Sequence, residues 1–245
     1  ELTGEYGASI NEYDLATLFK GDDDVTLKSV ICTSDNLPKG LAIENNKIVG
    51  TFKEATEEEG KKVTFEFEAN NGVKHSTDLT IKISPAELTI KPDADQILYK
   101  DEEIKYTYEG VFNDEKPEFT GKLIVENGKI AIGSLALVGE LAKNYIIKSI
   151  IDVNFINHLD INVKDIEAKL SEADGKNGCY KEKVTFTAPE GFKIKKVKNE
   201  GLRDETGYTS SFEFTDEGSW KITYSLLRDN TTDEYEHTAD IIIDN

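Results

Sequence analysis

The sequence contains little of the chemistry on which most catalytic and metal sites depend. Its 245 residues include no methionine, one tryptophan, two cysteines and three histidines. The histidines are dispersed, and neither a second histidine nor a cysteine lies at zinc-ligand spacing from any of them. Neither a Gly-x-Ser-x-Gly nucleophile motif nor a glycine-rich phosphate loop before a helix is present. We therefore expect a protein that is not an enzyme and that carries no cofactor.

Long apolar runs are also missing. No stretch approaches the roughly 18 apolar residues that a membrane-spanning helix needs, so we expect no membrane insertion within this segment. The first residue is a glutamate and methionine is absent throughout. We expect the chain to be a processed or excised piece, with any signal peptide or anchor lying outside it.

Basic residues are few relative to acidic ones. The chain has 48 acidic and 29 basic residues, a formal net charge of -19, and the excess is spread along its whole length. Such a surface repels polyanions, which argues against nucleic acid and anionic membranes as partners. Evenly distributed acidic charge also keeps an exposed protein soluble and apart from its copies, so we expect a monomer.

The two cysteines are too few for a disulfide-stapled scaffold. Cys32 follows the apolar pair Val30-Ile31 and is interpreted as a small buried side chain. Cys179 ends the loop at residues 175–179 and is expected to be exposed. A whole predicted module separates them, so a bridge between them is not expected.

The most informative feature that is present is a repeated phrase. Residues 74–79 (KHSTDL) recur in type and order as residues 236–241 (EHTADI). Each phrase lies in the second arm of a predicted β-hairpin, because apolar residues alternate along residues 63–69 and 220–226 and turn residues follow at Asn71-Gly72 and Asp229-Asn230. On this pattern His75 and His237 take inward-facing, partly buried positions. Two such hairpins predict tandem β-modules.

The first module, residues 1–85, combines an acidic loop at Asp22-Asp23-Asp24 with two short motifs. These are Leu37-Pro38-Lys39-Gly40-Leu41 and, after a turn at Asn45-Asn46, Lys47-Ile48-Val49-Gly50-Thr51. A short helical turn is expected at residues 14–19. The succession resembles the Ig-like or cadherin-like modules found in tandem on bacterial surface proteins. The likeness covers nearly all of residues 11–84.

The second module, residues 86–158, reads differently. It opens with Leu88-Thr89-Ile90, continues through Tyr106-Thr107-Tyr108 and Phe119-Thr120-Gly121, and includes Gly133-Ser134-Leu135 and Asn144-Tyr145. This order of motifs is similar to the MBG module, a repeat of large bacterial surface proteins. The family has a glycine after its first tyrosine, whereas Lys100 follows Tyr99 here, which implies a differently built turn.

The third module, residues 159–245, is similar to bacterial Ig-like repeats over residues 210–245, where Glu217-Gly218-Ser219-Trp220 leads into the last hairpin. The resemblances and the strand patterns together predict an all-β fold, a tandem array of three small Ig-like β-sandwich modules. The joints at residues 84–86 and 157–160 are short and lack a flexible Gly/Ser tether, so we expect an elongated arrangement with limited bending.

One cation site is a candidate. Asp22, Asp23 and Asp24 cluster carboxylates of the kind that calcium prefers, and cadherin-like modules hold calcium between repeats. The chain lacks the alternating Asp-x-Asp-x-Asp-Gly order that fixes such ligands, so the alternative is a solvated acidic turn. We expect calcium to raise the stability only slightly.

The aromatic residues leave two interpretations open. Trp220 alternates with polar residues and is assigned to the core, and Tyr99, Tyr106, Tyr108 and Tyr145 are expected to pack within the second module. A small tyrosine-lined patch for a ligand is the alternative.

The expected function is that of a non-catalytic structural or stalk segment of a bacterial surface or secreted protein, which spaces or presents other domains. Its partners would be neighbouring modules of the same polypeptide. The alternative is an adhesin or glycan-binding module that engages a host protein or glycan. A third interpretation is a non-catalytic segment of an extracellular polysaccharide-degrading enzyme.

Overall fold

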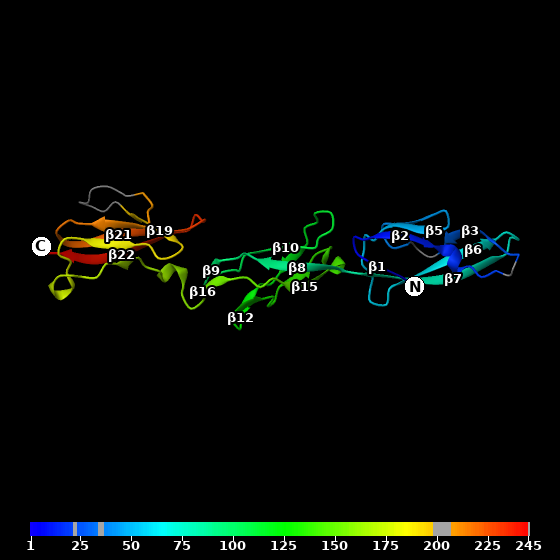
Figure 1. The fold of residues 1–245 in the computed structure, drawn as a ribbon, viewed down its shortest axis with the longest axis horizontal. Coiled ribbons are helices and arrows are strands. Elements are labelled where there is room, and N and C mark those ends of the chain that lie inside the picture. The colour runs from blue at the N-terminus through cyan, green and yellow to red at the C-terminus, as the bar shows by residue number, and fades with distance from the viewer. Residues whose placement is uncertain (22–23, 34–36, 198–206, 245) are drawn as a thin grey trace. The chain divides into compact units, whose positions relative to one another are not determined.

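The computed structural model describes residues 1–21, 24–33, 37–197 and 207–244, and within them the chain is all-β, as predicted. The described residues form strands β1 to β22 and four short 3-10 turns, η1 to η4 (Figure 1). The contacts divide the chain into two compact units. Unit 1 comprises residues 1–95 and 103–154, and unit 2 comprises residues 96–102 and 155–245. The division into three modules and the elongated arrangement stay predictions.

The first part of unit 1 is a sandwich of two sheets. One sheet has the order β1-β7-β6-β3 and the other the order β2-β5-β4. The strands span Leu2–Glu5 (β1), Ser9–Asp14 (β2), Leu27–Cys32 (β3), Leu41–Glu44 (β4), Lys47–Thr51 (β5), Lys61–Ala69 (β6) and Lys74–Ser84 (β7). The hydrophobic core between the sheets contains Leu15, Val30, Ile48, Phe52, Val63, Phe65, Phe67, Leu79, Ile81 and Ile83. Both layers contribute side chains, so the closed core is a small β-sandwich core.

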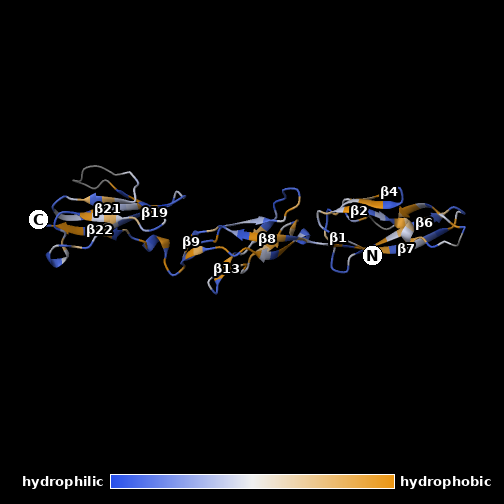
Figure 2. Cartoon of the chain, viewed as in Figure 1, coloured by the Kyte–Doolittle hydropathy of each residue, from blue (hydrophilic) through white to orange (hydrophobic). Residues whose placement is uncertain are grey.

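The predicted β6/β7 hairpin is confirmed. Its antiparallel register pairs Lys61 with Ile81 and Glu68 with Lys74, on either side of the turn at Asn71-Gly72. Buried and half-buried residues alternate along β6 from Val63 to Ala69. Figure 2 shows hydrophobic and hydrophilic residues interspersed over the strands of this sandwich. This alternation places one face of the sheet on the core and the other in solvent.

Local backbone geometry explains which residues stand in the short motifs of the first module. Asn45 and Asn46 both have positive φ, 50° and 63°, which suits the tight turn that joins β4 to β5. Gly50 has φ 123°, and a Cβ atom added to it would lie 2.1 Å from the Gly40 carbonyl oxygen. The glycines of the two motifs therefore let neighbouring strands approach closely. The predicted helical turn is η1, Leu15–Leu18, capped by the Asp14 side chain.

The rest of unit 1 is built on three smaller sheets, with strand orders β10-β8-β15, β11-β14 and β12-β13. The strands span Ala86–Pro92 (β8), Tyr106–Glu109 (β10), Glu118–Thr120 (β11), Ile124–Glu126 (β12), Lys129–Ala131 (β13), Ala136–Val138 (β14) and Tyr145–Ile150 (β15), with η2 at Ala142–Asn144. Strand β8 follows β7 after a single residue, Pro85. Strands β8 and β15 pair in parallel and lie side by side (Figure 1).

Unit 2 contains a second sandwich and a two-stranded parallel sheet. The parallel sheet pairs β9 (Gln96–Tyr99) with β16 (Phe155–His158). The facing sheets have the orders β17-β18-β20 and β19-β21-β22. Their strands span Lys169–Leu170 (β17), Val184–Thr187 (β18), Phe192–Lys196 (β19), Ser211–Phe214 (β20), Gly218–Arg228 (β21) and Glu234–Ile243 (β22), with η3 at Val163–Asp165 and η4 at Lys176–Gly178.

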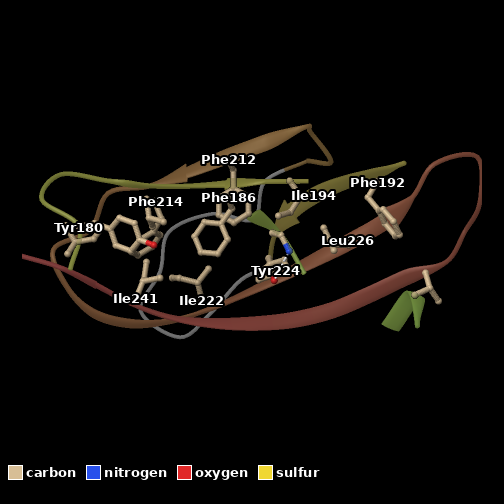
Figure 3. Close-up of a cluster of buried hydrophobic side chains, with 14 of the residues drawn as sticks. Tyr180, Phe186, Phe192, Ile194, Phe212, Phe214, Ile222, Tyr224, Leu226 and Ile241 are labelled. Carbon is tan, nitrogen blue, oxygen red and sulfur yellow. Dashed lines mark hydrogen bonds between the residues drawn. The ribbon is translucent and has the colours of Figure 1, made fainter. Parts of the chain in front are cut away.

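The core of unit 2 is rich in aromatic residues. Phe186 stacks on Phe212 with ring centroids 4.8 Å apart, and Tyr224 packs against Phe186 at 5.5 Å. Figure 3 shows these side chains pointing into the space between the sheets together with Ile222, Leu226 and Ile241. The predicted hairpin is confirmed as β21/β22, with Gly218 paired to Ile243 and Leu227 to Glu234.

Some individual residues differ from the prediction. His75 is exposed rather than partly buried, and it lies in the half of β7 that does not pair with β1. His237, by contrast, is half-buried as predicted and stacks on Tyr224 at 5.6 Å. Cys32 and Cys179 are both half-buried, so neither the predicted burial nor the predicted exposure is complete.

Trp220 and Tyr99 both pack in the core of unit 2, one as predicted and one not. Trp220 packs partly buried against the core of unit 2, 5.7 Å from the Phe214 ring, in agreement with its assignment to the core. Tyr99 was expected to pack among residues 86–158. It is 3% exposed and belongs to the core of unit 2, where its ring lies 6.2 Å from that of Phe192. Its strand β9 is part of unit 2, which a linear reading of the sequence does not reveal.

Candidate functional site

The most distinctive polar cluster of unit 1 joins the two ends of that unit's sequence. Tyr6 directly follows β1, and its backbone N–H donates to the Ser84 carbonyl at 2.9 Å. Tyr145 is the first residue of β15, and Glu115 lies in the loop between β10 and β11. We refer to Tyr6, Glu115 and Tyr145 as the tyrosine–glutamate cluster.

Both tyrosine hydroxyls donate to one carboxylate. The Tyr6 hydroxyl lies 2.8 Å from Glu115 Oε1 and 2.9 Å from Oε2, and the Tyr145 hydroxyl lies 2.5 Å from Oε2. The Tyr145 hydroxyl also accepts from the Phe112 backbone N–H at 2.9 Å. Hydrogen bonds to an ionised acceptor are the strong class, so the carboxylate ties three separate segments together.

Aromatic packing surrounds these hydrogen bonds. The Tyr6 ring meets Tyr145 edge-on at 5.3 Å and Phe112 edge-on at 5.9 Å. Tyr6 and Tyr145 are buried and form one hydrophobic cluster with Ala86 and Leu88. Edge-to-face contacts of this kind add to the gain from burial. The cluster therefore combines buried aromatic contacts with a half-buried carboxylate that accepts hydrogen bonds from both tyrosine hydroxyls.

Burial affects the ionisation of both tyrosines. Burial, followed by the hydrogen bond to Glu115 and the charge of that carboxylate, raises the pKa of Tyr6 to about 12. The same causes, burial first, raise the pKa of Tyr145. Both hydroxyls are held protonated, which is the state in which they can donate.

We expect the stability of unit 1 to fall as the pH rises from about 10 to about 12. The folded pKa of Tyr6 lies above its unfolded value, so the stabilisation is fully present below pH 10 and is lost through this window. Two pKa units correspond to about 2–3 kcal/mol. Alkaline unfolding curves of the wild type and of Tyr6→Phe measure the effect. The variant should show a smaller loss over this range, and identical losses would contradict the assignment.

A second contact lies beside the cluster. The buried Asn144 side chain accepts from the Ala55 backbone N–H at 3.0 Å. Next to it, Glu54 forms ion pairs with Lys143 and, at 3.4 Å, with Lys39. The hydrogen bond from Lys143 holds the pKa of Glu54 below its usual range. Within unit 1, residues 1–85 thus meet residues 86–95 and 103–154 through satisfied polar groups as well as apolar packing.

These residues border an open cleft of about 970 Å³ in unit 1. Its lining combines aromatic, acidic and basic side chains: Tyr6, Lys39, Lys53, Glu54, Phe112, Asn113, Glu115, Gly139, Glu140, Leu141, Ala142, Lys143 and Asn144. The carboxylates of Glu54 and Glu115 are engaged by neighbours in the same unit, and the Tyr6 ring is covered. The cleft has the size of a ligand site. However, Tyr6, Glu54 and Glu115 in its lining already form hydrogen bonds or ion pairs with neighbouring residues.

Unit 2 contains a comparable polar clamp. Arg228, at the end of β21, forms a bidentate pair with Glu102 through Nη1 and Nη2, the second bond being 2.9 Å. Nη2 also donates to the Ile97 carbonyl at 3.0 Å, and the guanidinium lies 5.3 Å from the Tyr99 ring. Arginine suits this position because its planar fork can bind a carboxylate and stack on a ring at once. The clamp fastens residues 96–102 to the sandwich of unit 2.

The predicted calcium site is only partly within the described chain. Asp22 and Asp23 lie outside the described residues. Asp24 is exposed, and its carbonyl accepts from the Asn70 side chain at 3.3 Å. Among the residues that the structure describes, no three His, Cys, Asp or Glu side chains gather as a metal site would require. The calcium candidate stays a prediction.

The polar contacts of both units involve residues that sequence reasoning did not single out. Glu115 and Glu102 are two of many acidic loop residues, and nothing local marks them. Two signals were available. The Asn144-Tyr145 pair belongs to the motifs that resemble the MBG module, and Arg228 is one of only two arginines in the chain. Tyr6 has no comparable signal.

Comparisons with known proteins give only weak structural likenesses. No family model matches the chain, and no curated protein matches its sequence. Among solved structures, extracellular domains 3–5 of Drosophila OTK share 8% identity at a TM-score of 0.30, covering 99% of this chain and 94% of that one. The endo-fucoidan hydrolase MfFcnA9 of glycoside hydrolase family 107 shares 13% identity at 0.26, covering 99% and 32%. The human desmocollin-1 ectodomain shares 12% at 0.23, covering 99% and 59%. Structural likenesses at TM-scores this low do not indicate a function.

The described residues contain no helix long and apolar enough to cross a membrane.

Proposed function

We propose that this chain is a non-catalytic spacer segment of a surface or secreted bacterial protein, which holds or presents other domains. Its partners in this role are neighbouring modules of the same polypeptide, and the segment acts as an extracellular monomer. The strong acidic excess supports the proposal, because evenly charged segments stay soluble and apart from one another.

The observation that carries the proposal is the tyrosine–glutamate cluster. A flexible tether would join residues 1–85 to residues 86–154 through solvated linker residues. Here the same two stretches share buried aromatic rings, a carboxylate with three tyrosine hydrogen bonds and the Asn144–Ala55 bond. Groups that satisfy one another in this way fix an orientation, and a fixed orientation is what a spacer requires.

The adhesive or glycan-binding alternative depends on the cleft of unit 1. A sugar site of the stacking type needs an aromatic face open to the ligand. The Tyr6 face is covered, and the carboxylates of Glu54 and Glu115 already have partners. These contacts favour the spacer, and the binding role stays a prediction.

Small-angle scattering tests the spacer proposal. A compact globule of this length would have a radius of gyration of about 18 Å. We expect a clearly larger value that does not change with protein concentration, because a spacer is extended and monomeric. A value near 18 Å, or a mass that grows with concentration, would contradict the proposal. Tyr145→Phe serves as the matched variant, since loosening the cluster should broaden the distance distribution without altering the mass.

A further inference from the structure

The first and last strands of the first sandwich are paired in parallel. Strand β1 pairs with the end of β7, from Leu2 opposite Ile81 to Glu5 opposite Ser84. The Tyr6 N–H extends the ladder to the Ser84 carbonyl. Strand β1 therefore enters this sandwich beside the strand by which the chain leaves it, and both strands run in the same direction.

The same arrangement recurs further along the chain. In unit 1, β8 pairs in parallel with β15, from Ala86 opposite Tyr145 to Ile90 opposite Ile150. In unit 2, β9 pairs in parallel with β16, from Gln96 opposite Phe155 to Tyr99 opposite His158. Since β9 follows β8 and β16 follows β15, the same two chain segments pair in parallel twice, once in each unit.

In the described part of the C-terminal sandwich the parallel contact with the last strand is a single bridge, and the first strand, β17, does not take part in it. Tyr180 forms an isolated parallel bridge with Ile243. It is made by the Tyr180 N–H with the Ile242 carbonyl and by the Asp244 N–H with the Tyr180 carbonyl, both at 2.9 Å. The last strand of the chain is again the one paired in parallel, here with a single residue.

Parallel pairing of entry and exit strands determines how a pull on the chain ends is resisted. A pull on the N-terminal end of one strand and the C-terminal end of its parallel neighbour slides the two along each other. All hydrogen bonds between the strands then carry the load together, whereas strands pulled apart from one end break their bonds one at a time. Resistance to a pull is set by the unfolding rate, which depends on bonds that must break in the transition state.

We propose that this chain is a tension-bearing element, and that the β1/β7, β8/β15 and β9/β16 pairs are its load-carrying clamps. The proposal rests on the spacer function and deepens it, because a spacer between an anchored end and an attached partner is pulled along its length. The clamps differ in extent. The Tyr180–Ile243 bridge is the shortest, so the C-terminal sandwich yields first under load.

Force spectroscopy on the full chain, held by its two ends between reference modules, tests the proposal. Ile151→Pro removes the N–H that donates to the Ile90 carbonyl at 2.9 Å and extends the β8/β15 ladder. Thr33→Pro is the matched control in the same unit. It removes the N–H that donates to the Thr64 carbonyl, also at 2.9 Å, in the antiparallel β3/β6 pair, which carries no load. Ile151→Ala separates the loss of the side chain from the loss of the N–H.

We expect Ile151→Pro to raise the forced unfolding rate of unit 1 by about threefold to tenfold, the effect of losing one loaded hydrogen bond. Thr33→Pro and Ile151→Ala should leave that rate within about twofold of the wild type. The first event in the wild type should release about 300 Å of chain, the length of the C-terminal sandwich when extended. Equal effects of the two proline variants, or wild-type behaviour of Ile151→Pro, would overturn the proposal.

A second variant covers the case in which Ile151→Pro does not fold. Lys100→Pro removes the N–H that donates to the Ile161 carbonyl beside the β9/β16 pair of unit 2. Lys100→Pro should lower the force at which the β9/β16 pair separates in the same assay. An unchanged unfolding force would count against the proposal. The spacer function fails separately. A compact radius of gyration would refute the spacer even with strong clamps, and weak clamps would leave an extended spacer that bears no load.

Discussion

Replacing Tyr145 by phenylalanine is expected to lower the free energy of unfolding of unit 1 by about 2–3 kcal/mol. The substitution keeps the ring and its packing against Tyr6. It removes the donor to Glu115 and, at the same time, the acceptor of the Phe112 N–H. The loss is large because it combines a hydrogen bond to a charged group with a backbone donor left without its partner.

Hydrogen exchange is the suitable measurement, because a chain of two units need not unfold in one step. Peptides from residues 86–95 and 103–154 should lose protection in Tyr145→Phe, while peptides from unit 2 should not. Tyr108→Phe is the matched control. Its ring packs on Phe119 at 5.1 Å, outside the cluster, and its loss should stay below about 0.5 kcal/mol. Equal losses in the two variants would show that the cluster contributes nothing beyond ring packing.

Replacing Arg228 by methionine is expected to destabilise unit 2 by about 2–3 kcal/mol. The side chains of Arg228 and Glu102 are 20% and 23% exposed, so the loss should fall below the 3–5 kcal/mol of a fully buried pair. Three interactions disappear together: the bidentate pair, the bond to the Ile97 carbonyl and the contact with the Tyr99 ring. Glu102 also loses its cationic partner.

Thermal unfolding and hydrogen exchange of residues 96–102 would measure this loss. Lys183→Met is the control, because the Lys183 and Glu213 side chains are each about half exposed and such pairs contribute at most about 1 kcal/mol. The double variant Arg228→Met with Glu102→Leu should regain part of the stability, since it no longer leaves a carboxylate unpaired. If Lys183→Met cost as much as Arg228→Met, the clamp could not be the cause.

The hairpins and short motifs could be predicted because their determinants are local. Alternation along residues 63–69 and a turn at Asn71-Gly72 are sufficient to specify β6 and β7 and their register. The pair Asn45-Asn46 specifies a tight turn by its tolerance of positive φ. Patterns of this kind carry the same information wherever they lie in a chain, which is why the all-β class followed from the sequence.

The tyrosine–glutamate cluster could not be predicted, because its members are far apart in the chain. Tyr6 and Glu115 are separated by 109 positions, and Glu115 lies in a loop with other charged residues. No periodicity links them. Only the packing of β1 against the end of β7 brings Tyr6 to the start of β8. Tyr99 was assigned to the wrong core for a related reason, since strand β9 belongs to a unit that most of its sequence neighbours do not share.

The division of the chain into two units has a consequence for how it reaches the native state. Unit 2 takes residues 96–102 from the middle of unit 1, so the polypeptide passes between the units three times. Strand β8 must wait for β15, and β9 for β16, before either can complete its parallel ladder. Pairings so distant in sequence form late and slowly. During synthesis, residues 86–99 therefore emerge long before their partners, and this stretch is where a chaperone or an aggregating neighbour would first find an unfinished edge.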